Sequence, residues 1–101
     1  MRIQLLSFPG CPHVQSARES LRRALAELQL QVDIEEIDTS ALRTPAALQA
    51  WGSPTILVDG RDVAGDEPTG TCCRLYDGSA GHRGVPTDAL IRAAIEQALA
   101  R

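Results

Sequence analysis

Residues 7–28 read SFPGCPHVQSARESLRRALAEL and place one cysteine between a Pro-Gly pair and a proline, directly before an amphipathic pattern. From Pro12 to about Leu30, apolar residues recur every three or four positions, which predicts one helix with an apolar stripe facing a sheet. Charged residues occupy the other faces of this helix. Cys11 therefore stands where a turn meets the start of the first long helix.

The segments on either side of this helix are predicted strands. Residues 2–8, RIQLLSF, suit a strand buried on both faces, and residues 31–38, QVDIEEID, suit a strand with one solvent-exposed face. A short helix is expected within residues 39–51, with Pro45 at its first position and Gly52 after its end.

The second half of the chain is predicted to contain a hairpin, a long loop and a helix. Residues 53–63 read as a β-hairpin, because an apolar run is followed by Asp-Gly and a short return strand. Periodicity is lost over residues 63–81, which predicts a loop. Residues 87–100 regain helical spacing, with Thr87 or Asp88 as the N-cap.

This order of elements, β-α-β-α-β-β-α, predicts a single α/β domain over residues 1–101. We expect a central mixed four-stranded sheet with helices on both faces, because a βαβ crossover comes first and a hairpin comes last. A chain of 101 residues that is 44% hydrophobic can bury one modest core.

Composition narrows the classes of function. The net charge is −3 and all ten basic residues are scattered arginines, so no basic stripe for nucleic acid is expected. No apolar run is long enough for a signal peptide or a membrane span. Three cysteines, an odd number, do not describe a disulfide framework. We therefore expect a cytoplasmic protein without nucleic-acid or membrane partners.

Two motifs, FPGCPHV at residues 8–14 and GSPTILVDGRDVAGDEPTG at residues 52–70, resemble those of thioredoxin-fold proteins of the glutaredoxin-like kind. The order of elements extends this resemblance to the whole chain. It implies a nucleophilic thiol at Cys11 and, opposite it, a cis-proline at Pro54 that follows Ser53. A cis bond there would expose backbone groups able to pair with an extended peptide or a small thiol.

Elementary electrostatics also favours a reactive Cys11. If Cys11 is the N-cap and Pro12 the first helical residue, unpaired amides and the positive end of the helix dipole stabilise the thiolate. The thiolate is the form that attacks disulfides. His13 could add positive charge when protonated.

Structural roles compete with these functional ones. Cys11 could be a buried filler at a helix start, Pro54 an ordinary trans proline at the start of a strand, and His13 an exposed helix residue. Trp51 is expected to cover the core, although its position would also suit a wall of a substrate groove.

The chain departs from the family pattern in two respects. Val14 occupies the position of the second cysteine of a dithiol oxidoreductase, so the dithiol cycle cannot run through the helix motif, and a monothiol route through Cys11 remains open. Residues 7–9 provide none of the positive charge that glutathione-using relatives carry before the motif. Asp66 and Glu67, by contrast, resemble the acidic turn that holds the γ-glutamyl amine of glutathione.

Cys72 and Cys73 form a vicinal pair with three candidate roles. One of them could resolve a disulfide on Cys11, or all three sulfurs could hold a soft ion such as Hg²⁺ or an arsenical. The pair could also be passive. Zinc is less suited, because His13 and His82 show no ligand spacing to the pair.

Three hypotheses follow. The leading one is a thiol-disulfide oxidoreductase or thiol-exchange protein that acts through Cys11 on a small-molecule thiol or a disulfide-bearing protein. It needs no organic cofactor beyond a reducing thiol such as glutathione. The second is a binding protein for a soft metal or metalloid, and the third is a non-catalytic thioredoxin-fold binding module.

Overall fold

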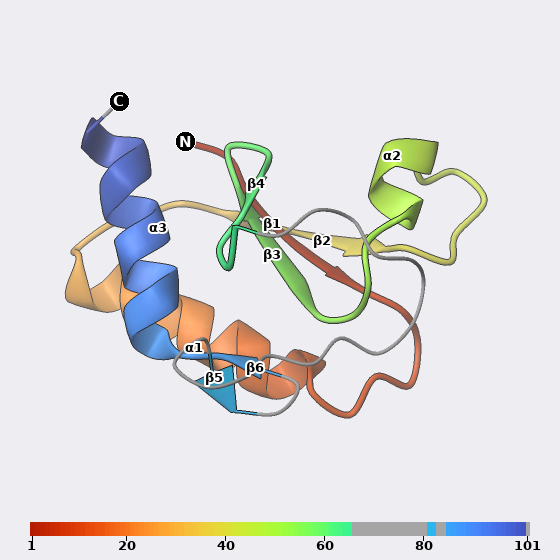
Figure 1. The fold of residues 1–101 in the computed structure, drawn as a ribbon, viewed down its shortest axis with the longest axis horizontal. Coiled ribbons are helices and arrows are strands. Elements are labelled where there is room, and N and C mark those ends of the chain that lie inside the picture. The colour runs from red at the N-terminus through yellow and green to blue at the C-terminus, as the bar shows by residue number, and fades with distance from the viewer. Residues whose placement is uncertain (66–80, 83–84, 101) are drawn as a thin grey trace.

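The computed structural model describes residues 1–65, 81–82 and 85–100 (Figure 1). Within these residues the helices are α1 (Val14–Glu27), α2 (Ala46–Gln49) and α3 (Asp88–Ala100). The strands are β1 (Ile3–Ser7), β2 (Ile34–Asp38), β3 (Thr55–Val58), β4 (Arg61–Asp62), β5 (Gly81–His82) and β6 (Val85–Pro86). In this described part of the chain, no helix combines the length and the apolar character needed to cross a membrane.

The main sheet is mixed and has the strand order β2-β1-β3-β4. β1 and β2 run parallel and are joined by α1, whereas β3 is antiparallel to β1 and β4 is antiparallel to β3. A helical crossover is the usual connection between parallel neighbours, and a tight turn is the usual one between antiparallel neighbours. The predicted mixed four-stranded sheet of an α/β protein is therefore confirmed.

The β3–β4 hairpin turns at Asp59 and Gly60, whose φ angles are 51° and 82°. Positive φ at both central positions is typical of a type I′ turn, whose twist matches that of the strands. Asp59 Oδ1 also accepts a hydrogen bond from the amide of Arg2 at 2.8 Å, which attaches the turn to the start of β1. The hairpin predicted from Asp-Gly is therefore confirmed.

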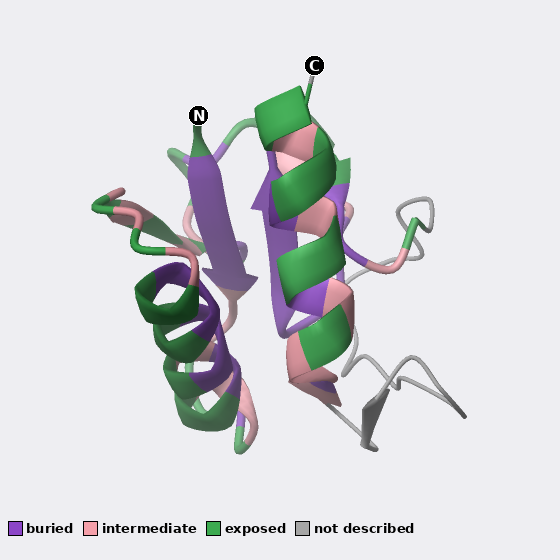
Figure 2. Ribbon diagram, turned by 90° about the vertical axis from the view of Figure 1, so that its left-hand side faces the viewer, coloured by how far each residue is buried: buried purple, intermediate pink, exposed green. Residues whose placement is uncertain are grey.

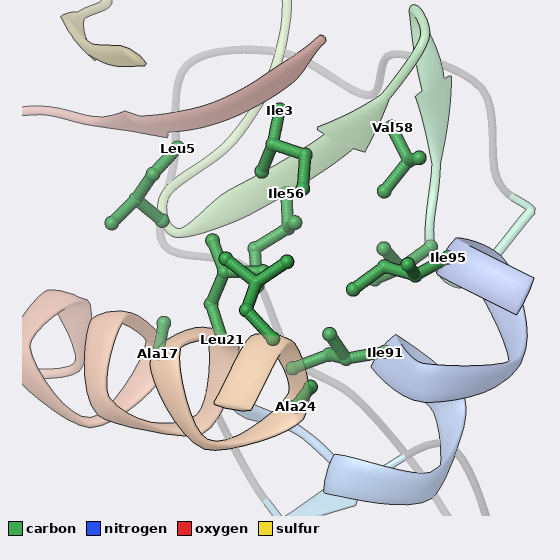
Figure 3. Close-up of a cluster of buried hydrophobic side chains, with 11 residues drawn as sticks. Ile3, Leu5, Ala17, Leu21, Ala24, Ile56, Val58, Ile91 and Ile95 are labelled. Carbon is green, nitrogen blue, oxygen red and sulfur yellow. The ribbon is translucent and has the colours of Figure 1, made fainter. Parts of the chain in front are cut away.

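The larger core lies between one face of the sheet and the helices α1 and α3 (Figure 3). Ile3 and Leu5 contribute to it from β1, because alternate side chains of a strand share a face. Leu21 of α1 is 0% exposed, and Ile91 and Ile95 of α3 complete the cluster. Figure 2 shows the same division along α1, with a buried stripe toward the sheet and an exposed stripe outward.

The opposite face of the sheet carries a smaller core of Leu6, Trp51 and Leu57. Ile37 of β2 and Leu48 of α2 pack against it. Because Leu48 belongs to α2, helices cover both faces of the sheet, as the element order predicts.

Ion pairs join α1 to its neighbours. The shortest N–O distance is 2.6 Å between Arg18 and Glu36 of β2, and 3.1 Å between Arg23 and Asp88 of α3. Each guanidinium donates two hydrogen bonds to its carboxylate, which its planar fork permits. Hydrogen bonding to Arg18 lowers the pKa of Glu36, and hydrogen bonding to Arg23 lowers the pKa of Asp88.

Some local boundaries differ from the sequence expectation. Pro45 is the N-cap of α2 and not its first helical residue. β5 and β6 form a separate antiparallel pair, with Gly81 opposite Pro86, in a region where no strand was expected. Strands of two residues are too short to show an alternating pattern, so the sequence cannot indicate them.

Candidate functional site

Cys11 ends a tight turn that follows β1. Its amide donates a hydrogen bond to the carbonyl oxygen of Phe8 at 3.3 Å, which closes a four-residue β-turn. Pro9 takes the second position of this turn, and Gly10, with a φ of 85°, takes the third. Proline followed by a residue of positive φ is typical of a type II turn. The turn therefore folds the chain back and brings Cys11 beside the end of β1.

Helix α1 starts later than the sequence predicts. Its N-cap is His13, and the amide of Ala17 donates to the carbonyl oxygen of His13 at 3.0 Å. The expectation that Cys11 is the N-cap and Pro12 the first helical residue is wrong. Residues 11–13 include no Ser, Thr, Asp or Asn, the side chains that usually define an N-cap, and no side chain caps this helix. Cys11 lies two residues before the N-cap.

Ser53 and Pro54 lie next to the turn formed by Phe8–Cys11, which we call the cysteine turn, although they are distant from it in sequence. The amide of Phe8 donates a hydrogen bond to Ser53 Oγ at 3.4 Å. The Ser53–Pro54 peptide bond is cis, as the resemblance implies. Phe8 is thus hydrogen-bonded both to Cys11 and to Ser53, so the fold brings the two motifs together.

The site is more buried than the sequence predicts. Cys11 is 7% exposed, Ser53 is 0% exposed and Pro54 is less than 2% exposed. The expected exposure of the backbone at Ser53 and Pro54 is therefore not observed, because this segment leads directly into β3, which is paired on both sides. Cys11 is buried, as its competing role as a filler at a helix start predicts, although it belongs to neither of the two apolar clusters found among the described residues.

The residues that precede or follow Cys11 and Ser53 in the chain differ in exposure. Pro12 is exposed and His13 is half-buried, so both reach the surface beside Cys11. Trp51 is 8% exposed and packs with Leu6 and Leu57. The expected role of Trp51 as a cover over the core is confirmed.

A groove of about 330 Å³ lies beside the cysteine turn, on the side of β2. It is lined by Ser7, Phe8, Pro9, Gly10, Val14, Glu36, Ile37 and Asp38. Hydrogen bonds from Ser40 lower the pKa of Asp38, so the groove offers a carboxylate beside apolar walls. The sequence did not indicate this groove, because its walls come from strand ends that meet only in the folded sheet.

Four residues assigned to the site from the sequence, Asp66, Glu67, Cys72 and Cys73, lie outside the described residues. Among the residues that are described, no group of three or more His, Cys, Asp or Glu side chains could hold a metal ion.

The chain matches no protein-family model, no curated protein and no solved structure.

Proposed function

We propose that the protein is a thioredoxin-fold thiol-exchange protein in which Cys11 is the nucleophile. The observation that carries this proposal is the position of Cys11, which the Phe8–Cys11 turn holds just before α1, while Phe8 joins that turn to Ser53. The mixed sheet, with its parallel pair first and its hairpin last, supports the fold assignment.

Helix α1 begins at Val14, three residues after Cys11 in the chain. The first amides of a helix have no acceptor within the helix, and the positive end of the helix dipole lies there. α1 has 14 residues and no acidic side chain in its first turn. The thiolate is the attacking species in thiol exchange.

The proposed reaction has two exchange steps. The Cys11 thiolate attacks one sulfur of a disulfide, forms a mixed disulfide with it and releases the other sulfur as a thiolate. A small thiol such as glutathione, as its thiolate, then attacks the mixed disulfide and releases the Cys11 thiolate. The number of disulfide bonds is unchanged. One half of the substrate disulfide leaves as a thiolate, and the small thiol takes its place. Val14 stands where a dithiol enzyme carries its resolving cysteine, so the start of α1 supplies no resolving thiol, and in this proposal the small thiol provides it.

Small-molecule thiols or disulfide-bearing proteins are the partners in this proposal. The reducing cytoplasm is the proposed compartment, because free thiols persist there.

The decisive experiment locates the mixed disulfide. Reduced protein is mixed with glutathione disulfide, and the modified cysteine is identified by peptide mass spectrometry. We expect the adduct on Cys11 and its release by added thiol. Cys11→Ser should abolish both steps, whereas the double variant Cys72→Ser/Cys73→Ser is the matched control and should retain them. A control variant that forms no adduct at Cys11 would overturn the proposal.

The same variants separate thiol exchange from the two other hypotheses. Tight, stoichiometric Hg²⁺ uptake that is lost in the double variant, without exchange at Cys11, would support sequestration of a soft metal. A folded protein that performs neither reaction would support a non-catalytic binding module.

A further inference from the structure

We infer that Ser53 is a positioning residue for Cys11, because its hydroxyl holds the turn that carries the sulfur. The inference rests on the proposed function, since it assigns Ser53 a part in thiol exchange. Ser53 is 0% exposed, so its side chain is closed to a dissolved substrate. Any effect of the hydroxyl on the reaction therefore has to pass through the protein.

The hydroxyl acts where the main-chain pairing of the sheet stops. The register between β1 and β3 ends with Leu6 opposite Thr55. Continued by two residues, this register places Phe8 opposite Ser53. Pro54, between Ser53 and Thr55, has no N–H to add to the ladder. The amide of Phe8 instead donates to Ser53 Oγ at 3.4 Å, so a side chain attaches the end of β1 to the segment before β3.

The constraint then passes from Phe8 to Cys11. The carbonyl oxygen of Phe8 accepts the amide of Cys11 at 3.3 Å. Pro9 has a fixed φ, and the hydrogen bond between Cys11 and Phe8 closes the turn around Gly10, so the turn has few alternative conformations. Holding Phe8 in place therefore holds Cys11 in place. Without the hydroxyl the amide of Phe8 loses this acceptor, and the turn is free to shift. Thiol exchange depends on the approach of one sulfur to another, so such a shift slows it.

The test compares two buried hydroxyls of one segment. Thr55 is also 0% exposed, and its Oγ1 donates to the carbonyl oxygen of Gly52, within its own segment, at 2.7 Å. Ser53→Ala should slow the reaction of Cys11 with glutathione disulfide by about tenfold or more. Thr55→Val, the matched control, should leave this rate nearly unchanged. Ser53→Thr keeps a hydroxyl and should restore most of the rate.

Amide hydrogen exchange measures the same constraint without thiol chemistry. In the unmodified protein the amides of Phe8 and Cys11 should be protected. Ser53→Ala should speed the exchange of both amides, and Thr55→Val should not.

Three outcomes are informative. An unprotected Phe8 amide in the unmodified protein overturns the inference, even if Ser53→Ala fails to fold. Unchanged amides and an unchanged rate in a folded Ser53→Ala variant also overturn it. Ser53→Ala could speed exchange of the two amides while the unmodified protein forms no adduct at Cys11. This result would support the role of Ser53 in restraining the turn and would overturn the proposed function.

Discussion

Gly10 and Gly60 share nearly the same backbone conformation, with φ angles of 85° and 82°, although Gly10 precedes Cys11 and Gly60 closes the β3–β4 hairpin. A Cβ atom added at either glycine meets no described heavy atom within 4 Å, its chain neighbours aside. Substitution therefore costs conformational energy and creates no clash with these residues. Comparing variants at the two positions therefore distinguishes a general loss of stability from a local effect on the cysteine turn.

Gly10→Ala and Gly60→Ala should each lower the free energy of unfolding by about 1–2 kcal/mol, because a residue with a Cβ is strained at positive φ. Urea denaturation measures this loss. Only Gly10→Ala should also change the rate at which iodoacetamide alkylates Cys11, because only Gly10 belongs to the turn that ends there. Equal alkylation rates in the two variants would contradict the assigned role of the turn.

Leu21 and Leu42 form a matched pair for the core. Leu21 is 0% exposed between α1 and the sheet, and Leu42 is 100% exposed. Leu21→Ala should lower the free energy of unfolding by roughly 2–5 kcal/mol, because the lost methyl groups leave a cavity. Leu42→Ala should change it by less than about 0.5 kcal/mol. Chemical denaturation of both variants checks the result, and similar losses would show that the core is assigned to the wrong residues.

Thr87 caps α3. Its Oγ1 accepts a hydrogen bond from the amide of Leu90 at 3.2 Å, and its carbonyl oxygen accepts one from the amide of Ile91 at 3.1 Å. Thr87→Ala should lower the free energy of unfolding by about 0.5–2 kcal/mol, because the Leu90 amide loses its acceptor. Thr87→Ser retains the oxygen and should lose much less. A serine variant as unstable as the alanine variant would exclude the capping role.

The pair between Arg18 and Glu36 should make stability depend on pH. Hydrogen bonding to Arg18 lowers the pKa of Glu36 below its ordinary value of 4.5 in the folded state. A lowered carboxylate pKa contributes stability above the unfolded value, and this contribution is lost as the pH falls through the folded value. Arg18→Gln should therefore be less stable than the unmodified protein at pH 7, with the difference vanishing in acid.

The size of this effect is small, because 44% of the Glu36 side chain is exposed and such pairs are worth about 0.2–1 kcal/mol. Urea titrations at several pH values measure it. Glu36→Gln introduced into the Arg18→Gln background is the control and should add little further loss at neutral pH. A gap between Arg18→Gln and the unmodified protein that persists in acid would assign the effect to packing of Arg18.

The elements of the fold could be predicted because their signals are local. The apolar stripe that includes Leu21 marks α1, and the Asp59–Gly60 pair marks the hairpin. The helix start was misplaced at Cys11, because no capping side chain marks His13 as the true N-cap. Strands β5 and β6 were missed because two residues carry no periodic signal.

The site could be predicted only in part. The sequence singled out Cys11, Ser53 and Pro54, and the resemblance implied the cis bond that the structure shows. The hydrogen bond from Phe8 to Ser53 Oγ was not foreseen, because it depends on which residues face each other where β1 and β3 stop pairing. The burial of Ser53 and Pro54 was also not foreseen, because it depends on what packs around the start of a central strand.

By itself, the sequence determined the order of the helices and of the four strands of the main sheet, and the apolar face of each long element, since both follow from the spacing of residues that are neighbours in the chain. Tertiary structure alone decided that Phe8 meets Ser53, and that the N-cap of α1 is His13 and not Cys11. Contacts between residues 45 positions apart depend on strand register and on competition for burial, and no local pattern records either of these.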